Sequence, residues 1–240
     1  MILIADSGST RTDWQILGAD QRSEHLSTKG MNPYYQGAEE MRQTIFKELL
    51  PHIQEEIKEI YFYGAGCSLE KNQKRVAAVL MEGFPEAKIE VSHDLLAAAR
   101  SLGGKDACLV GILGTGSNAC FYDGKVIAST QLNLGYILGD EGSGAHLGKQ
   151  LIQDFMHAEM PPLLREKFAR QFKITRGEIL EQVYQKPLAN RYLASFSKFL
   201  FENQEVTYCK LLVFNSFDDF IRKYLLKLFE EKPIVAHFIG

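Results

Sequence analysis

Two short turns of the chain combine glycine with hydroxyl side chains, and each directly follows an apolar strand. The first reads DSGST at residues 6–10, and the second reads GTGSN at residues 114–118. Glycine lets backbone N–H groups approach an anion closely, and Ser and Thr hydroxyls add further donors. One such turn alone is typical of an ordinary hairpin, where Gly, Ser and Asp are common. Two in matching positions, the first with an acid at the strand end, predict a pair of phosphate-binding loops.

The second turn also fits the GxGxxA form of the dinucleotide fingerprint over residues 114–119. That fingerprint requires a helix next, because the helix N-terminus binds the pyrophosphate. Here the next residues, CFYDGKVI, read as a strand with an Asp-Gly hairpin signal. The sequence also contains no GxxxxGKS/T motif. These observations exclude a Rossmann site and a P-loop NTPase.

The surroundings of the two turns are also alike. Residues 108–129 repeat the opening of the chain: an apolar strand, a Gly/Thr/Ser turn, a second strand and a hairpin turn at Asp123-Gly124. Such self-similarity indicates a duplicated unit. We therefore expect two related α/β domains, at residues 1–104 and 105–240.

Strands alternate with helices through the first half of the chain, which predicts a mixed α/β sheet. We expect strands at residues 1–6, 12–17, 24–27, 59–66 and 88–94, and helices at 38–50, 71–84 and 95–102. From residue 143 helix follows helix, including one helix over residues 190–202, up to residue 232. A final strand is expected over residues 232–240.

The composition is that of a soluble globular protein, with 45% apolar and 24% charged residues. A net charge of −3 argues against a general nucleic-acid or membrane-surface role, because phosphate neutralisation needs clustered Lys and Arg. No stretch reaches the roughly 18 apolar residues that a membrane span needs. The four cysteines form no CxxC pair, which favours buried free thiols in a reducing, cytoplasmic compartment.

The two turns together resemble the two phosphate loops of the sugar kinase, Hsp70 and actin superfamily. The block GYILGDEGSGAHLG at residues 135–148 resembles a narrower group, the N-acetylglucosamine kinase and BadF/BadG-type ATPase family. The resemblance covers nearly the whole chain. It implies two duplicated ribonuclease H-like (actin-like ATPase) domains with a cleft between them, the second with a large helical insertion.

The resemblance also implies roles for individual residues. Asp94, in SHDLLAAA, matches the base that takes the proton from the attacking sugar hydroxyl, and Asp6 would hold Mg²⁺ through water. The residues expected to bind the phosphates of ATP are Gly8, Ser9, Thr10, Thr12, Thr115, Gly116 and Ser117. Those expected to contact the sugar are Asn32, Gly66, Asn118, Gly139 and Asp140, with Glu141 in the same segment.

Structural interpretations of the same residues stay open. An Asp between a strand and an apolar helix is a preferred N-cap, so Asp94 has a structural role available beside the catalytic one. Asn32 precedes Pro33 and fits a plain Asn-Pro turn. Asp140 and Glu141 could cap the helix expected from about residue 143.

The activity implied by the resemblance is ATP-dependent phosphoryl transfer to the 6-hydroxyl of an amino sugar, with Mg²⁺ as cofactor. N-acetylglucosamine is the first candidate, N-acetylmuramic acid and glucosamine are close variants, and a homodimer is compatible with it. The alternative is a BadF-type ATPase that activates a partner enzyme and holds an iron–sulfur cluster through a Cys in a Gly-rich loop, as Cys67 in GAGCS could. A third hypothesis is a non-catalytic sugar or nucleotide sensor.

The last strand marks a departure from the superfamily pattern. There the adenine lies against a Gly-rich turn after a late strand, and VAHFIG at residues 235–240 matches that strand and its first Gly. The resemblance therefore implies a second domain truncated at its C-terminus: either the natural chain continues by some tens of residues, or this form lacks most of its adenine site. For the chain as written we expect weak or absent ATP binding.

Overall fold

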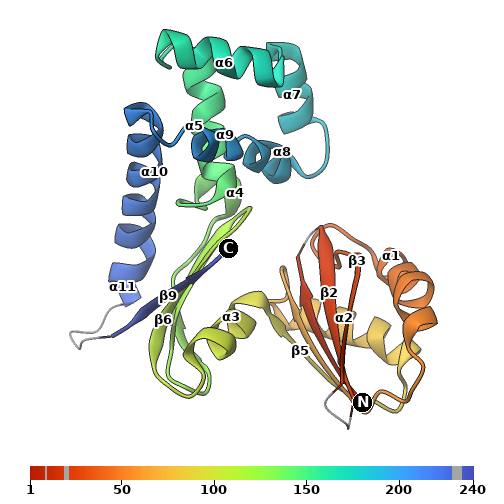
Figure 1. Cartoon of the computed structure of the whole chain (residues 1–240). Coiled ribbons are helices and arrows are strands. Elements are labelled where there is room, and N and C mark those ends of the chain that lie inside the picture. The colour runs from red at the N-terminus through yellow and green to blue at the C-terminus, as the bar shows by residue number, and fades with distance from the viewer. Residues whose placement is uncertain (9, 19–21, 229–233) are drawn as a thin grey trace. The chain divides into compact units, whose positions relative to one another are not determined.

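The computed structural model describes residues 1–8, 10–18, 22–228 and 234–240. The chain divides into two compact units, Met1–Ser101 and Leu102–Gly240. Each unit is built on its own mixed β-sheet (Figure 1).

The sheet of the first unit has the strand order β3-β2-β1-β4-β5. Its three N-terminal strands form an antiparallel meander, and the other two run parallel to the first of them. The bounds are β1 (Ile2–Ser7), β2 (Arg11–Leu17), β3 (Ser23–Lys29), β4 (Glu59–Gly64) and β5 (Lys88–His93). Every second residue of β4 is buried, as expected for a strand with one face on a core.

The core of this unit lies between the sheet and its helices. Trp14 and Phe62 are fully buried with ring centroids 5.9 Å apart, and the indole Nε1 donates a hydrogen bond to Thr28 Oγ1 at 2.9 Å. The helices supply two apolar stripes, from Met41, Ile45 and Leu49 and from Val76, Val79 and Leu80. Two of the helices of this unit are α2 (Glu70–Gly83) and α3 (Asp94–Gly103).

The helix expected over residues 38–50 is not one regular helix. It consists of α1 (Ala38–Thr44), a π-helical turn η1 (Ile45–Leu49) and a 3-10 turn η2 (Leu50–His52). Pro51 lies at the start of the 3-10 turn. Because proline lacks an N–H, it cannot continue the helical hydrogen-bond ladder, and the helical segment ends with this turn.

The second unit repeats the first four strands of the first unit. Its sheet has the order β8-β7-β6-β9, with β7 antiparallel and β9 parallel to β6, which matches β3-β2-β1-β4. The bounds are β6 (Cys108–Leu113), β7 (Ser117–Tyr122), β8 (Ile127–Thr130) and β9 (Ala236–Ile239). The expected hairpin turn forms at Asp123, whose Oδ1 accepts the amides of Lys125 and Val126, both at 2.8 Å. The duplication predicted from the sequence is confirmed.

Between β8 and β9 the second unit is helical, as expected. The helices are α4 (Gly135–Leu138), α5 (Gly144–Met156), α6 (Pro162–Phe172), α7 (Arg176–Tyr184), α8 (Ala189–Ser195), α9 (Lys198–Glu202), α10 (Thr207–Phe220), η3 (Ile221–Leu225) and α11 (Leu226–Leu228). Five aromatic residues centred on Phe168 form much of their core. The segment α10–η3–α11 then leads to β9 beside β6 (Figure 1).

The single helix expected over residues 190–202 is interrupted. Ser195 Oγ donates to the Tyr192 carbonyl at 2.7 Å, and Ser197 Oγ donates to the Ala194 carbonyl at 2.8 Å. Serine hydroxyls that bond the preceding turn compete with the helical backbone ladder. The chain therefore makes a turn at residues 196–197 between α8 and α9.

Two further expectations from composition can be compared with the structure. All four cysteines are buried and free. In the described part of the chain, no helix is long and apolar enough to cross a membrane.

Gly177, in the first turn of α7, offers a test of the helical part. A Cβ added there meets no atom closer than Thr175 Oγ1 at 3.9 Å, so alanine fits without strain. Alanine also loses less conformational entropy than glycine in a helix. Gly177→Ala is expected to stabilise the protein by about 0.4–1 kcal/mol, measured as a higher urea midpoint with an unchanged slope. A lower midpoint would contradict the structure of α7.

Candidate active site

The site residues of the first unit meet at the carboxyl ends of its parallel strands. Ser7 of β1 is in register with Gly64 of β4, and Gly64 with His93 of β5. Asp6 therefore lies on the same edge of the sheet as the Gly66 loop and as Asp94, which follows β5. In open α/β sheets, this edge is where ligands bind.

Buried hydroxyls form the base of the first turn. Ser7 Oγ and Thr12 Oγ1 are 2.7 Å apart, and both residues are fully buried. Ser7 Oγ also bonds the carbonyl and the amide of Met31, at 3.2 and 3.1 Å, and Thr12 Oγ1 donates to the Lys29 carbonyl at 3.2 Å. Thr12, expected to bind phosphate, thus has its hydroxyl inside the protein, where it shapes the turn.

The tip of the same turn reaches the surface. The Gly8 amide donates to the Arg11 carbonyl at 2.9 Å and closes the hairpin. The Thr10 side chain is exposed, so its hydroxyl is accessible to a ligand. Ser9, also expected at the phosphate, lies outside the described residues.

At this edge the charge of Asp94 acts on Asp6. Desolvation by the surrounding protein, and after it the negative charges of Asp94 and Asp13, raise the pKa of Asp6. Burial raises the pKa of Asp94, opposed by the Leu95 amide, which donates to Asp94 Oδ1 at 2.9 Å. Asp94 is the first residue of α3 and accepts from the next amide. An N-cap would instead lie before the helix and accept from an amide two or three residues on.

The surroundings of Asp6 fit Mg²⁺. Among the described residues, no three or more His, Cys, Asp or Glu side chains gather into a group that could hold a metal ion. Mg²⁺, however, usually keeps several waters and takes only one or two carboxylates beside substrate phosphates. A divalent cation at Asp6 would also offset the repulsion from Asp94, which adds to desolvation in raising the Asp6 pKa.

Asn32 and Gly66, far apart in sequence, lie against each other. Gly66 has φ +82°, and a Cβ there would overlap Asn32 Oδ1 and lie 2.8 Å from Tyr34 Cδ2. Asn32 Oδ1 accepts the Tyr34 amide at 2.9 Å, so the turn expected at Asn-Pro is also present. From α2, Asn72 Nδ2 donates to the Gly66 carbonyl at 2.7 Å. Asn72 was not predicted from the sequence, because an Asn within a helix belongs to no local motif.

In the second unit, the GTGSN turn and Asp140 are joined directly. Asp140 Oδ1 accepts the Ser117 amide at 3.2 Å and Asn133 Nδ2 at 2.7 Å, and Asn133 Nδ2 also contacts the Ser117 carbonyl. A Cβ on Gly116 would lie 3.0 Å from Asp140 Oδ2, so any side chain there would crowd the carboxylate. Burial raises the pKa of Asp140, while its hydrogen bonds from Asn133 and Ser117 oppose that shift.

Helix α5 begins against the same turn. The Gly144 amide donates to the Gly114 carbonyl at 2.9 Å, and the Ala145 amide to the Thr115 carbonyl at 3.1 Å. Ser143 is the N-cap, since its Oγ accepts the His146 amide at 3.1 Å. The cap considered for Asp140 or Glu141 is therefore supplied by Ser143.

The side chains of the second turn differ in exposure. Thr115 is exposed. Ser117 is buried, and its Oγ has no hydrogen-bond partner within the described structure. Asn118 Oδ1 accepts the Ala119 amide at 2.9 Å. This turn therefore presents one accessible hydroxyl and one buried, unsatisfied hydroxyl.

Glu141 is fixed by two donors from the end of the helical part. Lys223 Nζ donates to Glu141 Oε1 and the Tyr224 hydroxyl to Oε2, each at 2.8 Å. Although burial alone would raise the pKa of Glu141, these two hydrogen bonds lower it. A Cβ on Gly139 would lie 3.2 Å from the Tyr224 hydroxyl. Asn133, Lys223 and Tyr224 were missed by sequence analysis; the only local signal was the Asn-Leu-Gly turn at residue 133.

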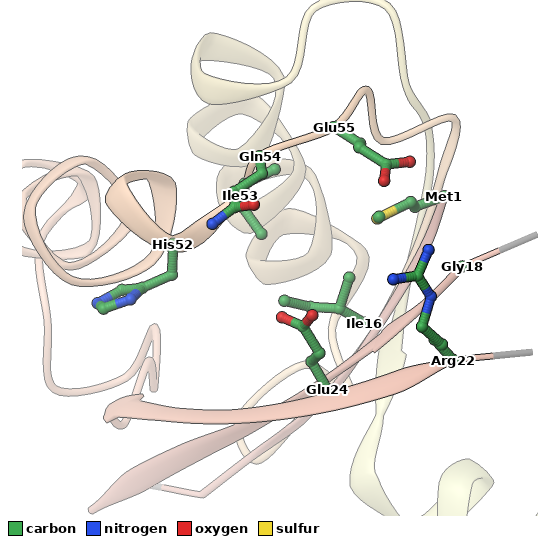
Figure 2. Close-up of a pocket in the computed structure, with 9 residues that line it drawn as sticks. All are labelled: Met1, Ile16, Gly18, Arg22, Glu24, His52, Ile53, Gln54 and Glu55. Atoms are coloured by element: carbon green, nitrogen blue, oxygen red, sulfur yellow. The ribbon is translucent and has the colours of Figure 1, made fainter.

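A pocket of the first unit lies at the other end of its sheet. It has a volume of about 340 Å³ and includes Met1 before β1 and Gly18 after β2. Figure 2 shows His52 at the end of η2 and Glu55 on the loop that follows, across the pocket from Ile16 of β2. Asp6 and Ser7 lie at the opposite end of β1, and none of the predicted site residues is among those lining this pocket.

Comparison with known proteins decides the family. No family model and no curated protein matches the chain. Among solved structures, the candidate N-acetylglucosamine kinase of Porphyromonas gingivalis is 42% identical, with a TM-score of 0.93 over 100% of this chain and 86% of that protein. The chain belongs to the N-acetylglucosamine kinase and BadF/BadG-type ATPase family.

More distant structures share the fold of this family. The candidate N-acetylglucosamine kinase of Chromobacterium violaceum is 17% identical with a TM-score of 0.79, over 100% of this chain and 86% of that one. A glucokinase of Streptomyces griseus, solved with glucose and AMPPNP, is 11% identical with a TM-score of 0.50. The match covers 98% of this chain and 94% of that one. The predicted actin-like, duplicated fold with a helical insertion in the second domain is confirmed.

Proposed function

We propose that the protein is an ATP-dependent amino sugar kinase that phosphorylates the 6-hydroxyl of N-acetylglucosamine, with N-acetylmuramic acid and glucosamine as close variants. The observation that carries the proposal is the 42% identity, over the whole chain, to the candidate N-acetylglucosamine kinase of Porphyromonas gingivalis. The carboxylates and glycine-rich turns described above support it. The four buried free thiols suit a reducing cytoplasm, where ATP is available.

In this proposal Asp94 is the general base. A carboxylate can orient the sugar hydroxyl and take its proton as the bond to phosphorus forms. Its place at the carboxyl edge of β5, with one oxygen held by the Leu95 amide, leaves the other oxygen for that proton. Asn32 and Gly66, which lie together in the same unit, would contact the sugar.

The two turns would hold the phosphates of ATP. The transition state spreads negative charge over the γ-phosphoryl oxygens, which backbone amides and hydroxyls stabilise. Among the described residues, the exposed hydroxyls of Thr10 and Thr115 are side-chain donors that a phosphate can reach, whereas Ser117 Oγ is buried and has no partner in the described structure. Gly8 and Gly116 would allow close approach of the backbone. Asp6 would hold Mg²⁺ through water, and Mg²⁺ neutralises phosphate charge when bound.

Three residues of the second unit complete the proposed sugar contacts. These are Asn118, Gly139 and Asp140. Asp140 is the best defined of them, because the Ser117 amide and Asn133 fix its carboxylate beside the second turn. A carboxylate held in this way can accept hydrogen bonds from sugar hydroxyls.

The alternative, a BadF-type activator, makes a different prediction about Cys67. Metal ligation requires a thiolate. Burial, and after it the charge of Asp94, raises the pKa of the fully buried Cys67 to about 12, which favours the neutral thiol. We expect anaerobically purified protein to be colourless. A brown protein whose visible absorbance disappears in Cys67→Ser would favour the activator and contradict the kinase.

A coupled assay of ADP release tests the proposed function. With Mg²⁺ and millimolar ATP, ADP release should depend on an amino sugar, and phosphorus NMR of the product should show a 6-phosphate. The panel is N-acetylglucosamine, N-acetylmuramic acid, glucosamine and glucose. ADP release that no sugar accelerates would contradict the kinase and favour the activator. Sugar binding without turnover would contradict it in favour of a sensor.

A further inference from the structure

The loop from Gly139 to Ser143 is held from two sides. On one side, Asp140 accepts the Ser117 amide at 3.2 Å and so joins the GTGSN turn. On the other side lies the segment α10–η3, residues 207–225, which reaches the loop through Glu141. Asp140 thus contacts the GTGSN turn, while the adjacent Glu141 contacts the α10–η3 segment. The backbone that the two acids share connects that turn to that segment.

The contact with Glu141 comes from a π-helical turn. Lys223 and Tyr224 are consecutive residues of η3, and they donate to the two different oxygens of one carboxylate. Glu141 has a side chain 12% exposed, whereas that of Lys223 is 51% exposed. π-turns inside helices occur frequently at functional sites.

The backbone of the loop also fits against α10. The Gly142 amide donates to Ser216 Oγ at 3.1 Å, and the same Oγ bonds His146 Nδ1 at 2.8 Å. Gly142 has φ +82°, and a Cβ there would lie 2.9 Å from the Cβ of Phe220. This close approach fixes the loop backbone directly after Glu141.

We propose that Lys223 and Tyr224 are positioning residues, which fix Glu141 and thereby hold Asp140 in place beside the GTGSN turn. Neither residue needs to touch a substrate for this role. The catalytic consequence rests on the proposed function, because only an amino sugar kinase would need Asp140 at its sugar.

The energetic reason is the burial of Glu141. A buried carboxylate that loses its cationic partner becomes an uncompensated charge, so the loop must shift or the acid must take a proton. Either response changes the backbone that carries Asp140. Arginine keeps the charge and the reach of Lys223, which is half-exposed and has room for the larger head group.

Amide hydrogen exchange tests the positioning role of Lys223 and Tyr224 without an activity assay. In Lys223→Met, the amides of residues 139–143 and 114–118 should exchange about tenfold or more faster, and in Lys223→Arg they should return toward the rates of the natural chain. Lys227→Met is the matched control, because Lys227 is exposed four residues further on and should change neither segment. Tyr224→Phe removes one donor without removing the ring. Tyr224→Phe should also speed exchange at these two segments, and it replaces Lys223→Met in the test if that variant does not fold.

Kinetics then test the consequence. Lys223→Met is expected to lower kcat/KM for the amino sugar by about ten- to a hundredfold, with Lys223→Arg restoring most of it. Unchanged exchange at residues 114–118 in both Lys223→Met and Tyr224→Phe would overturn the inference. A natural chain that phosphorylates no sugar would instead overturn the proposed function, while the exchange result still decides the positioning role.

Discussion

Replacing Asp94 with Asn is expected to lower sugar phosphorylation by ~10²- to 10⁴-fold, because the amide cannot take the proton of the attacking hydroxyl. The substitution is nearly isosteric. The amide oxygen can still accept the Leu95 amide, which donates to Asp94 Oδ1 at 2.9 Å in the natural chain. The start of α3 should therefore persist, so the loss would report on chemistry. Initial rates of ADP release at saturating sugar measure it.

The stability of the same variant should move in the opposite direction. Since burial raises the pKa of Asp94 above 3.8, the ionised carboxylate is less favourable in the folded state than in the unfolded one. The stability associated with this group is present at low pH and is lost as the pH rises through the folded-state pKa. At neutral pH, Asp94→Asn should thus melt at an equal or higher temperature than the natural chain. That advantage should disappear below pH 3.8.

The pH dependence of the reaction follows from the same shift. The base is active when ionised, so the rate should fall as the pH drops through a pKa that lies above the ordinary 3.8 of aspartate. Asp106→Asn is the control, because it makes the same chemical change at an exposed position of the second unit. It should leave the rate and its pH profile unchanged. Undiminished turnover in Asp94→Asn would remove Asp94 from the role of base.

The duplication, the strands and the family could be predicted from the sequence, because each depends on a local pattern of residues. The similarity between DSGST and GTGSN, together with the Asp-Gly turn at residue 123, was sufficient to predict the duplication that is seen in the strand order of both sheets. The alternation of apolar residues placed the strands to within a few residues. The family followed from GDEGSG, in which Gly142 requires glycine because it has φ +82° and lies against Phe220.

What could not be predicted depends on contacts between distant residues. Glu141 is paired with Lys223 and Tyr224, which are 82 and 83 residues away, and no spacing rule connects them. The family resemblance also assigned the hydroxyl of Thr12 to the phosphates of ATP. Its partners, Ser7 and Lys29, come from two other strands and take that hydroxyl into the interior.

Gly116→Val is expected to lower kcat/KM for ATP on the order of a hundredfold. A Cβ at this position would lie 3.0 and 3.2 Å from the two carboxylate oxygens of Asp140, and valine adds two methyl groups to that carbon. The Asp140 side chain cannot move away freely, because Asn133 Nδ2 donates a hydrogen bond to Asp140 Oδ1 at 2.7 Å and the Asp140 backbone has φ +56°. The GTGSN turn must therefore open, which would displace the donors proposed to bind phosphate.

Three measurements separate this effect from general destabilisation. Overpacking of this kind costs about 1–3 kcal/mol, so the variant should remain folded, as circular dichroism can verify. Gly177→Val adds the same side chain where a Cβ meets only Thr175 Oγ1 at 3.9 Å, and it should leave kcat/KM for ATP unchanged. Gly116→Ala should lie between the natural chain and valine, since only its Cβ approaches the carboxylate. If Gly116→Val is folded and uses ATP as well as the natural chain does, residues 114–118 are not the phosphate loop.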